Sequence, residues 1–186
     1  MSTTRLMGNP AGMTTLMTVG HGSLERGALV RLLTEHDVEL LVDVRRYPGS
    51  RRNPQTKPDA LKESLTRAGI DYRWDERLGG RRRLASDSRD TWWEVDQFRA
   101  YAGWTRTPDF AAGLRELLAE ATERRTAIMC AEAVWWRCHR RLIADVAVLL
   151  HHVRVVHLMH DGRLAEHRPA SGARVTDAGV VWDGDR

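Results

Sequence analysis

Both cysteines of this 186-residue chain, Cys130 and Cys138, lie in one short segment that continues with His139 and Arg140. Cys130 follows an apolar run that is typical of a buried strand, and Cys138 precedes an apolar run that is typical of a helix. A thiol between a strand end and a helix N-terminus lies where backbone N–H groups and the helix dipole stabilise a thiolate or a bound anion. The segment therefore predicts either a reactive cysteine, with the second cysteine resolving it or lining its pocket, or two small buried hydrophobic side chains.

Polar side chains of the same segment could assist a reactive thiol. His139 could act as its base or proton donor, and Glu132 could act as an acid or base or hold an arginine. Arg137 and Arg140 could clamp an oxyanion or a phosphate. Because neighbouring side chains on a helix point about 100° apart, we expect that Cys138 and His139 do not face the same ligand unless the loop before the helix is distorted.

The segment also offers ligands for a metal ion. Cys130, Cys138, His139 and His157 carry soft donor atoms, but the chain has neither a CxxC nor an HxxxH spacing around them. We therefore predict no metal site, and the sequence identifies no cofactor.

Apolar runs alternate with amphipathic segments along the chain, which predicts an α/β fold. The expected strands span 14–19, 40–45, 70–74, 126–129 and 153–158, and the expected helices span 24–36, 58–68, 93–101, 108–123 and 138–151. This order favours a mostly parallel sheet of about five strands with helices on both faces. In such a sheet, ligands bind beyond the carboxyl ends of the strands.

Polar residues follow four of the expected strands, so that they would meet at one rim of the sheet. His21 and Ser23 follow the first strand in a glycine-rich turn, where backbone amides could wrap an anion. Segments 43–45, 130–132 and 157–161 follow three other strands. This convergence predicts an anion-binding pocket at the carboxyl ends of the strands.

Asp43 and Arg45 lie two positions apart, so their side chains share one face of an extended strand. Their ion pair could hold the guanidinium over the pocket, or it could be a buried structural pair. Ser50 and Arg51, in the glycine- and proline-rich loop that follows, could bind phosphate groups.

The formal net charge is +4, and nearly all basic residues are arginine, since only Lys57 and Lys62 are lysine. Arginine is well suited to bidentate contacts with phosphate. Arginines at 45–52 and 81–83 could therefore contact nucleic acid, while Trp135 or Trp136 stacks on its bases. A solvated basic run at 81–83 and a tryptophan in the core are the structural alternatives.

The chain length suits a single domain. We expect a flexible segment over 1–13, an α/β domain over 14–168 and a C-terminal tail over 169–186. The sequence has no run of about 18 apolar residues and no signal-peptide pattern, and its two cysteines suit a reducing compartment. These features predict a cytoplasmic protein without membrane contact, and they leave a homo-oligomer open.

The motifs together resemble the DUF488 family of uncharacterised conserved proteins, over about residues 14 to 168. The residues that carry the resemblance are Gly20-His21-Gly22-Ser23, Asp43-Val44-Arg45, Gly79-Gly80, Cys130-Ala131-Glu132 and Cys138-His139-Arg140. The resemblance implies a soluble, cytoplasmic α/β protein and names no activity.

Two functions from different classes follow from these observations. The first is a cysteine-dependent enzyme that acts on a phosphorylated or other small anionic ligand. The alternative is a nucleic-acid-binding or nucleic-acid-processing module that uses the arginine clusters and the tryptophans.

Overall fold

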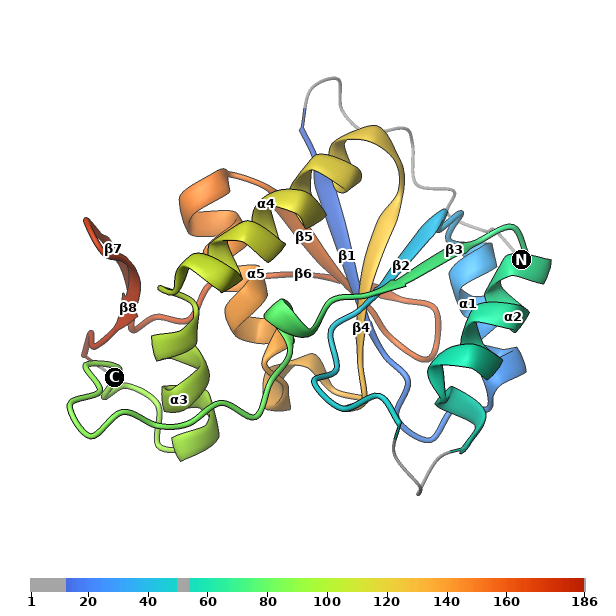
Figure 1. Ribbon diagram of the computed structural model, residues 1–186. Helices are drawn as coiled ribbons and strands as arrows, with labels where there is room; N and C mark the ends of the chain where they lie inside the picture. Colours follow the sequence, from blue (N-terminus) through green and yellow to red (C-terminus); the bar gives the residue numbers. More distant parts are fainter. Residues whose placement is uncertain (1–12, 50–53, 186) are drawn as a thin grey trace.

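The structure, a computed structural model, describes residues 13–49 and 54–185 (Figure 1). Its main sheet consists of β1 Thr15–Gly20, β2 Leu40–Asp43, β3 Asp71–Trp74, β4 Thr126–Cys130, β5 Arg154–Leu158 and β6 Leu164–Glu166. Its α-helices are α1 Arg26–Glu35, α2 Pro58–Arg67, α3 Asp96–Trp104, α4 Pro108–Glu123 and α5 Arg140–His151. Three short 3₁₀ turns are η1 Pro54–Thr56, η2 Glu76–Leu78 and η3 Trp135–Arg137. Residues 1–12 of the expected flexible segment, together with Ser50 and Arg51, lie outside the described residues.

The strands of the main sheet follow the order β3-β2-β4-β1-β5-β6. Neighbours from β3 to β5 pair in parallel, and β6 pairs antiparallel with β5. The predicted α/β fold with a mostly parallel sheet is therefore confirmed. The central position of β1 brings its carboxyl end between those of β4 and β5.

Two hydrophobic clusters cover the two faces of the sheet. On one face, Leu29 of α1 and Leu61 of α2 pack with Met129 of β4. On the other face, Phe110 of α4 and Ile143 of α5 pack with alternate strand residues. Because strand side chains alternate between the faces, nearly every residue of β1, β2 and β4 is buried, which explains their continuous apolar runs.

The segment that the sequence sets apart as a tail contains a hairpin of β7 Ala173–Thr176 and β8 Gly179–Trp182. The Trp182 side chain is fully buried, and its Nε1 donates to Asp145 Oδ2 at 2.7 Å. Its backbone N–H donates to Asp90 Oδ1 at 3.2 Å. Strand β8 thus packs on α5, and its Val180 and Trp182 belong to the hydrophobic core.

None of the described helices is long and apolar enough to span a membrane.

Candidate functional site

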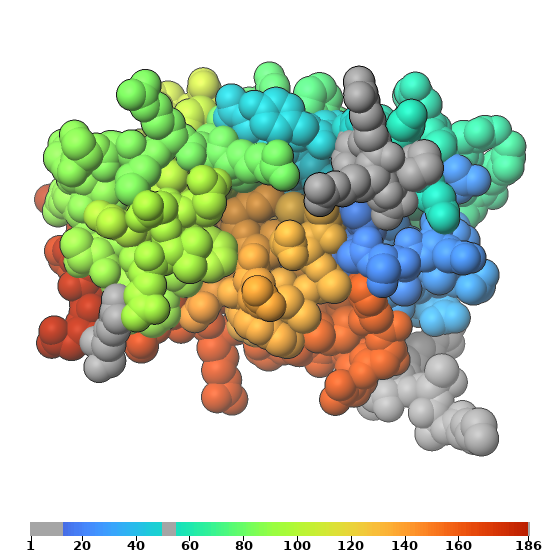
Figure 2. All heavy atoms as spheres, turned by 90° about the horizontal axis from the view of Figure 1, so that it is seen from below, coloured from blue at the N-terminus to red at the C-terminus, as the bar shows by residue number. Residues whose placement is uncertain are grey.

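The segments after β1, β2 and β4 meet at the carboxyl edge of the sheet, which Figure 2 views from below. Segment 130–140, in orange, lies in the middle of this face. The residues after β1, in blue, border it on one side, and the residues after β2, in cyan, border it on another. Three of the four segments that the sequence places at one rim therefore lie side by side on this face, and the anion-binding pocket stays a prediction.

A cluster of two buried thiols and a partly buried imidazole lies at this edge of the sheet. Cys130 Sγ and Cys138 Sγ are each 3.7 Å from His139 Nδ1. Cys138 and His139 therefore face one another, which we expected only if the loop before the helix departs from helical geometry, and the predicted helix start at Cys138 is wrong. Cys138 has an extended backbone with φ of −129° and ψ of 149°, and α5 begins only at Arg140, so the helical spacing of side chains does not apply.

The hydrogen bonds of His139 determine which ring nitrogen carries the proton. His139 Nε2 lies 3.0 Å from the carbonyl oxygen of Val44, which can only accept a hydrogen bond. The neutral ring therefore carries its proton on Nε2, and Nδ1 presents a lone pair to both sulfur atoms. Nδ1 can thus accept a proton from either thiol.

The environment shifts the pKa values of the two thiols in opposite directions. The hydrogen bond to Cys138, together with burial, raises the pKa of Cys130 well above its ordinary value. Burial alone would raise the pKa of Cys138, but the hydrogen bond from Cys130 and the interactions with His139 and Arg140 hold it well below its ordinary value. Cys138 is therefore the more acidic thiol of the pair.

The guanidinium of Arg140 is buried beside this thiolate, with only 1% of the residue exposed. Its Nε donates to Cys138 Sγ at 3.4 Å, and its Nη2 donates to the Glu132 carbonyl oxygen at 2.5 Å. Its Nη1 donates to Thr18 Oγ1 at 3.3 Å. Arg140 thus joins the thiolate, the loop after β4 and strand β1.

Thr18 begins a buried chain of hydrogen bonds that ends at a carboxylate. Thr18 Oγ1 lies 2.7 Å from His157 Nδ1, and His157 Nε2 lies 2.9 Å from His167 Nδ1. His167 Nε2 lies 2.7 Å from Asp145 Oδ1. Because the carboxylate can only accept, His167 Nε2 donates to Asp145. Burial, with the charges of His167 and Arg140, lowers the pKa of His157 to about 3, so His157 stays neutral.

The expected ion pair between Asp43 and Arg45 is present and buried. Arg45 Nη2 lies 2.5 Å from Asp43 Oδ2, and it also donates to the Thr56 carbonyl oxygen at 2.8 Å. Arg45 Nη1 lies 3.4 Å from His21 Nε2. Burial and the charge of Arg45 lower the pKa of His21. The donors of Arg45 are thus directed to groups of the protein itself.

A family model described as Domain of unknown function DUF488 matches residues 25–147 of the chain. The chain belongs to the DUF488 family. No curated protein and no solved structure matches it. The matched range of this DUF488 protein contains both thiols, His139 and Arg140, whereas Thr18 and His157 lie outside it.

Several predicted site residues of the DUF488 protein lie away from the thiol cluster. The side chains of Ser23, Glu132 and Arg137 are exposed, and in the described part of the chain no side-chain hydrogen bond joins them to the cluster. Glu132 contributes through its backbone, whose carbonyl oxygen accepts from Arg140.

Sequence reasoning missed the hydrogen-bonded chain that supports Arg140. One signal was present, because Thr18 and His157 are polar residues inside otherwise apolar strands, and they are direct partners across β1 and β5. A second was Asp145, a carboxylate on the buried face of α5. Trp135, an expected stacking residue, stacks on His157 with 4.1 Å between ring centroids.

The thiol cluster of the DUF488 protein has a donor set that zinc could use. The ligand atoms of Cys130, Cys138 and His139 lie within 4.8 Å of one another. His139 donates its other ring N–H to a carbonyl oxygen, as metal-bound histidines usually do. Three such ligands could hold Zn²⁺ with a fourth position open. The spacing rules on which we predicted no metal site do not detect ligands that meet only through folding.

Proposed function

We propose that this protein is a cysteine-dependent enzyme in which the Cys138 thiolate attacks an electrophilic, anionic substrate. One observation carries the proposal, namely that a guanidinium and an imidazole both contact the Cys138 sulfur, at 3.4 Å and 3.7 Å. A base and a fixed positive charge on one sulfur are the features that activate a cysteine nucleophile.

The neighbouring groups take distinct roles in this proposal. His139 Nδ1 accepts the proton of the Cys138 thiol and returns it to the leaving group. Arg140 stabilises the thiolate before the attack. Cys130 keeps its proton and hydrogen-bonds to Cys138, so that it is the thiol placed to resolve an intermediate on Cys138.

The experiment that tests the proposal is a titration of ultraviolet thiolate absorbance, which does not depend on the access of a reagent to a buried thiol. We expect one thiolate at neutral pH in the native protein, lost in Cys138→Ser and retained in Cys130→Ser. Arg140→Lys keeps the positive charge but loses the fixed N–H donor, so it should raise the pKa of Cys138. The proposal fails if both thiols titrate at or above about 8.5, the ordinary value for cysteine.

The zinc content of the purified protein provides a second, independent test. We expect no stoichiometric zinc when the protein is purified without chelator. A zinc content of about one ion per chain that is lost in Cys130→Ser, Cys138→Ser and His139→Gln would contradict the proposal. The cluster would then be a metal site, because a thiolate bound to zinc serves as a ligand.

A further inference from the structure

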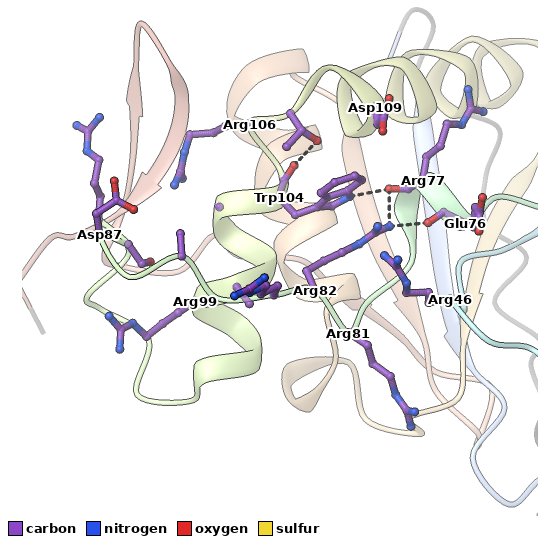
Figure 3. Close-up of a pocket in the computed structure, with 17 residues that line it drawn as sticks. Arg46, Glu76, Arg77, Arg81, Arg82, Asp87, Arg99, Trp104, Arg106 and Asp109 are labelled. Atoms are coloured by element: carbon purple, nitrogen blue, oxygen red, sulfur yellow. Dashed lines mark hydrogen bonds between the residues drawn. The ribbon is translucent and has the colours of Figure 1, made fainter.

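A cavity of about 830 Å³ lies between segment 76–89 and helix α3 (Figure 3). Its lining contains eight arginines and three carboxylates. The Cys138 thiol is not part of this lining. The cavity is thus a second, strongly basic region of the protein.

The cavity arginines differ in how their charges are compensated. Arg77 lies 2.7 Å from Asp75, and Arg106 lies 2.7 Å from Asp90. Across the described ranges, five other cavity arginines have no carboxylate oxygen within 4.0 Å: Arg46, Arg81, Arg82, Arg83 and Arg89. The cavity therefore carries a surplus of positive charge that the protein itself does not neutralise at short range.

Arg82 is one of these arginines, and contacts with its neighbours hold its side chain in place. Its guanidinium carbon lies 3.7 Å from the centroid of the Trp104 ring, and its Nε donates to the Gly79 carbonyl oxygen at 2.8 Å. Figure 3 shows Arg46 extending towards it. Burial and the charge of Arg46 lower the pKa of Arg82. An anion between these two side chains would relieve their repulsion, and a fixed guanidinium loses little conformational entropy when it binds one.

Two glycines form a thin wall between the cavity and the thiol cluster. A Cβ atom at Gly79 would lie 2.8 Å from Arg46 Cα, and a Cβ atom at Gly80 would lie 2.9 Å from His139 Nδ1. Tyr101 of α3 reinforces this wall, since its hydroxyl donates to the Leu78 carbonyl oxygen at 2.6 Å. A side chain at either glycine position would displace its neighbour. The cavity and the thiols are therefore adjacent.

We propose that this cavity binds the phosphate chain of a nucleoside di- or triphosphate. The guanidinium groups of arginine form paired hydrogen bonds with phosphate oxygens. The cavity volume falls within the roughly 300–1,000 Å³ that is typical of small-molecule sites, so the cavity has room for more than one phosphate group. Asp87 and Asp109 in the lining can accept hydrogen bonds from ribose hydroxyls. The same carboxylates would repel a nucleic-acid backbone that passed across them. The proposal rests on the cavity charges alone and does not require either cysteine to react.

The test is isothermal titration calorimetry of the full chain at low salt with ATP, ADP, tripolyphosphate and adenosine. We expect ATP, ADP and tripolyphosphate to bind and adenosine not to bind. Arg46→Ala and Arg83→Ala should each weaken ATP binding by about tenfold, because each removes one charged phosphate contact. The matched control is Arg31→Ala, an exposed α1 arginine without an ion pair in the described part of the chain, which should leave ATP affinity unchanged.

Three outcomes would overturn the proposal. The first is no binding of ATP or tripolyphosphate at about 1 mM ligand. The second is an equal loss of affinity in Arg31→Ala, which would indicate non-specific attraction to a basic protein. The third is much tighter binding of oligothymidylate that the cavity variants abolish, which would assign the cavity to single-stranded nucleic acid. Cys138→Ser should bind ATP normally, so failure of the thiol proposal and failure of this one are distinguishable.

Discussion

Two groups of arginines in this protein have opposite environments. The inner arginines, Arg45 and Arg140, are 5% and 1% exposed, and carboxylate, carbonyl, hydroxyl or sulfur atoms accept from their guanidinium nitrogens. The unpaired arginines of the cavity have no carboxylate oxygen of the described residues within 4.0 Å, and they are Arg46, Arg81, Arg82, Arg83 and Arg89. A buried charge must be compensated within the fold, whereas a charge at a cavity can be left for a ligand.

Arg45 and Arg46 show that adjacent residues can belong to different groups. Side chains of an extended chain alternate in direction, so the two side chains leave the end of β2 towards opposite sides. Arg45 meets Asp43 and Thr56, while Arg46 lines the cavity beside the Gly79 backbone. Position at a strand end is therefore insufficient to assign a ligand-binding role to an arginine.

The largest effect that would sharpen this comparison is expected at Arg140. Arg140→Met should lower the free energy of unfolding by about 4 kcal/mol, because it removes the buried donor to the Glu132 carbonyl oxygen and to Thr18. Urea denaturation measures the change. A loss below about 1 kcal/mol would contradict the assignment of Arg140 to the inner group.

A somewhat smaller effect is expected at the partner of Arg45. Asp43→Asn keeps the shape of the side chain but leaves the Arg45 charge buried without a counter-charge, and we expect a loss of about 3 kcal/mol. The control is Asp96→Asn, whose ion pair with Arg99 is long and lies at an exposed carboxylate. Equal stability losses in the two variants would remove the distinction between buried and exposed pairs.

Burial, together with the charges of His167 and Arg140, keeps His157 neutral, which predicts a dependence of stability on pH. His157 has a folded pKa of about 3 against an ordinary value of 6.5, so below about pH 6.5 the unfolded chain binds a proton that the folded protein does not. The stability should therefore fall as the pH drops from 6.5 towards 3, by up to about 1.4 kcal/mol per pH unit.

Urea denaturation at about pH 6 and about pH 5 measures this slope, and His157→Gln should make it shallower. NMR titration of the His157 ring in the native protein checks the same point without a variant. A ring that titrates near 6.5 in the folded protein would contradict the prediction.

The smallest effect on stability is expected among the cavity arginines. Arg83→Met should change the free energy of unfolding by less than about 0.5 kcal/mol, because Arg83 is exposed and has no carboxylate neighbour in the described part of the chain. Urea denaturation measures this change as well. If Arg83→Met lowered the free energy of unfolding as much as Arg140→Met, the proposed difference between the two groups of arginines would be contradicted.

The sequence was sufficient for the fold because buried parallel strands leave continuous apolar runs, as 40–43 and 126–130 do. It was also sufficient to single out the thiol segment. It could not determine the start of α5, and a shift of two residues placed Cys138 outside the helix and turned it towards His139. The cavity was missed because its arginines come from separate segments, and the run 81–83 resembles a solvated surface until the fold places Trp104 beneath Arg82.

The central position of β1 has a consequence for the synthesis of the chain. β1 is made first, but its two neighbours, β4 and β5, begin only at Thr126 and Arg154. At about 5–20 residues per second, this apolar strand leaves the ribosome on the order of ten seconds before either partner exists. Parallel pairing between such distant segments is also intrinsically slow. We therefore expect β1 to be the segment where chaperones have the most time to bind, and where overproduction of the protein first leads to aggregation.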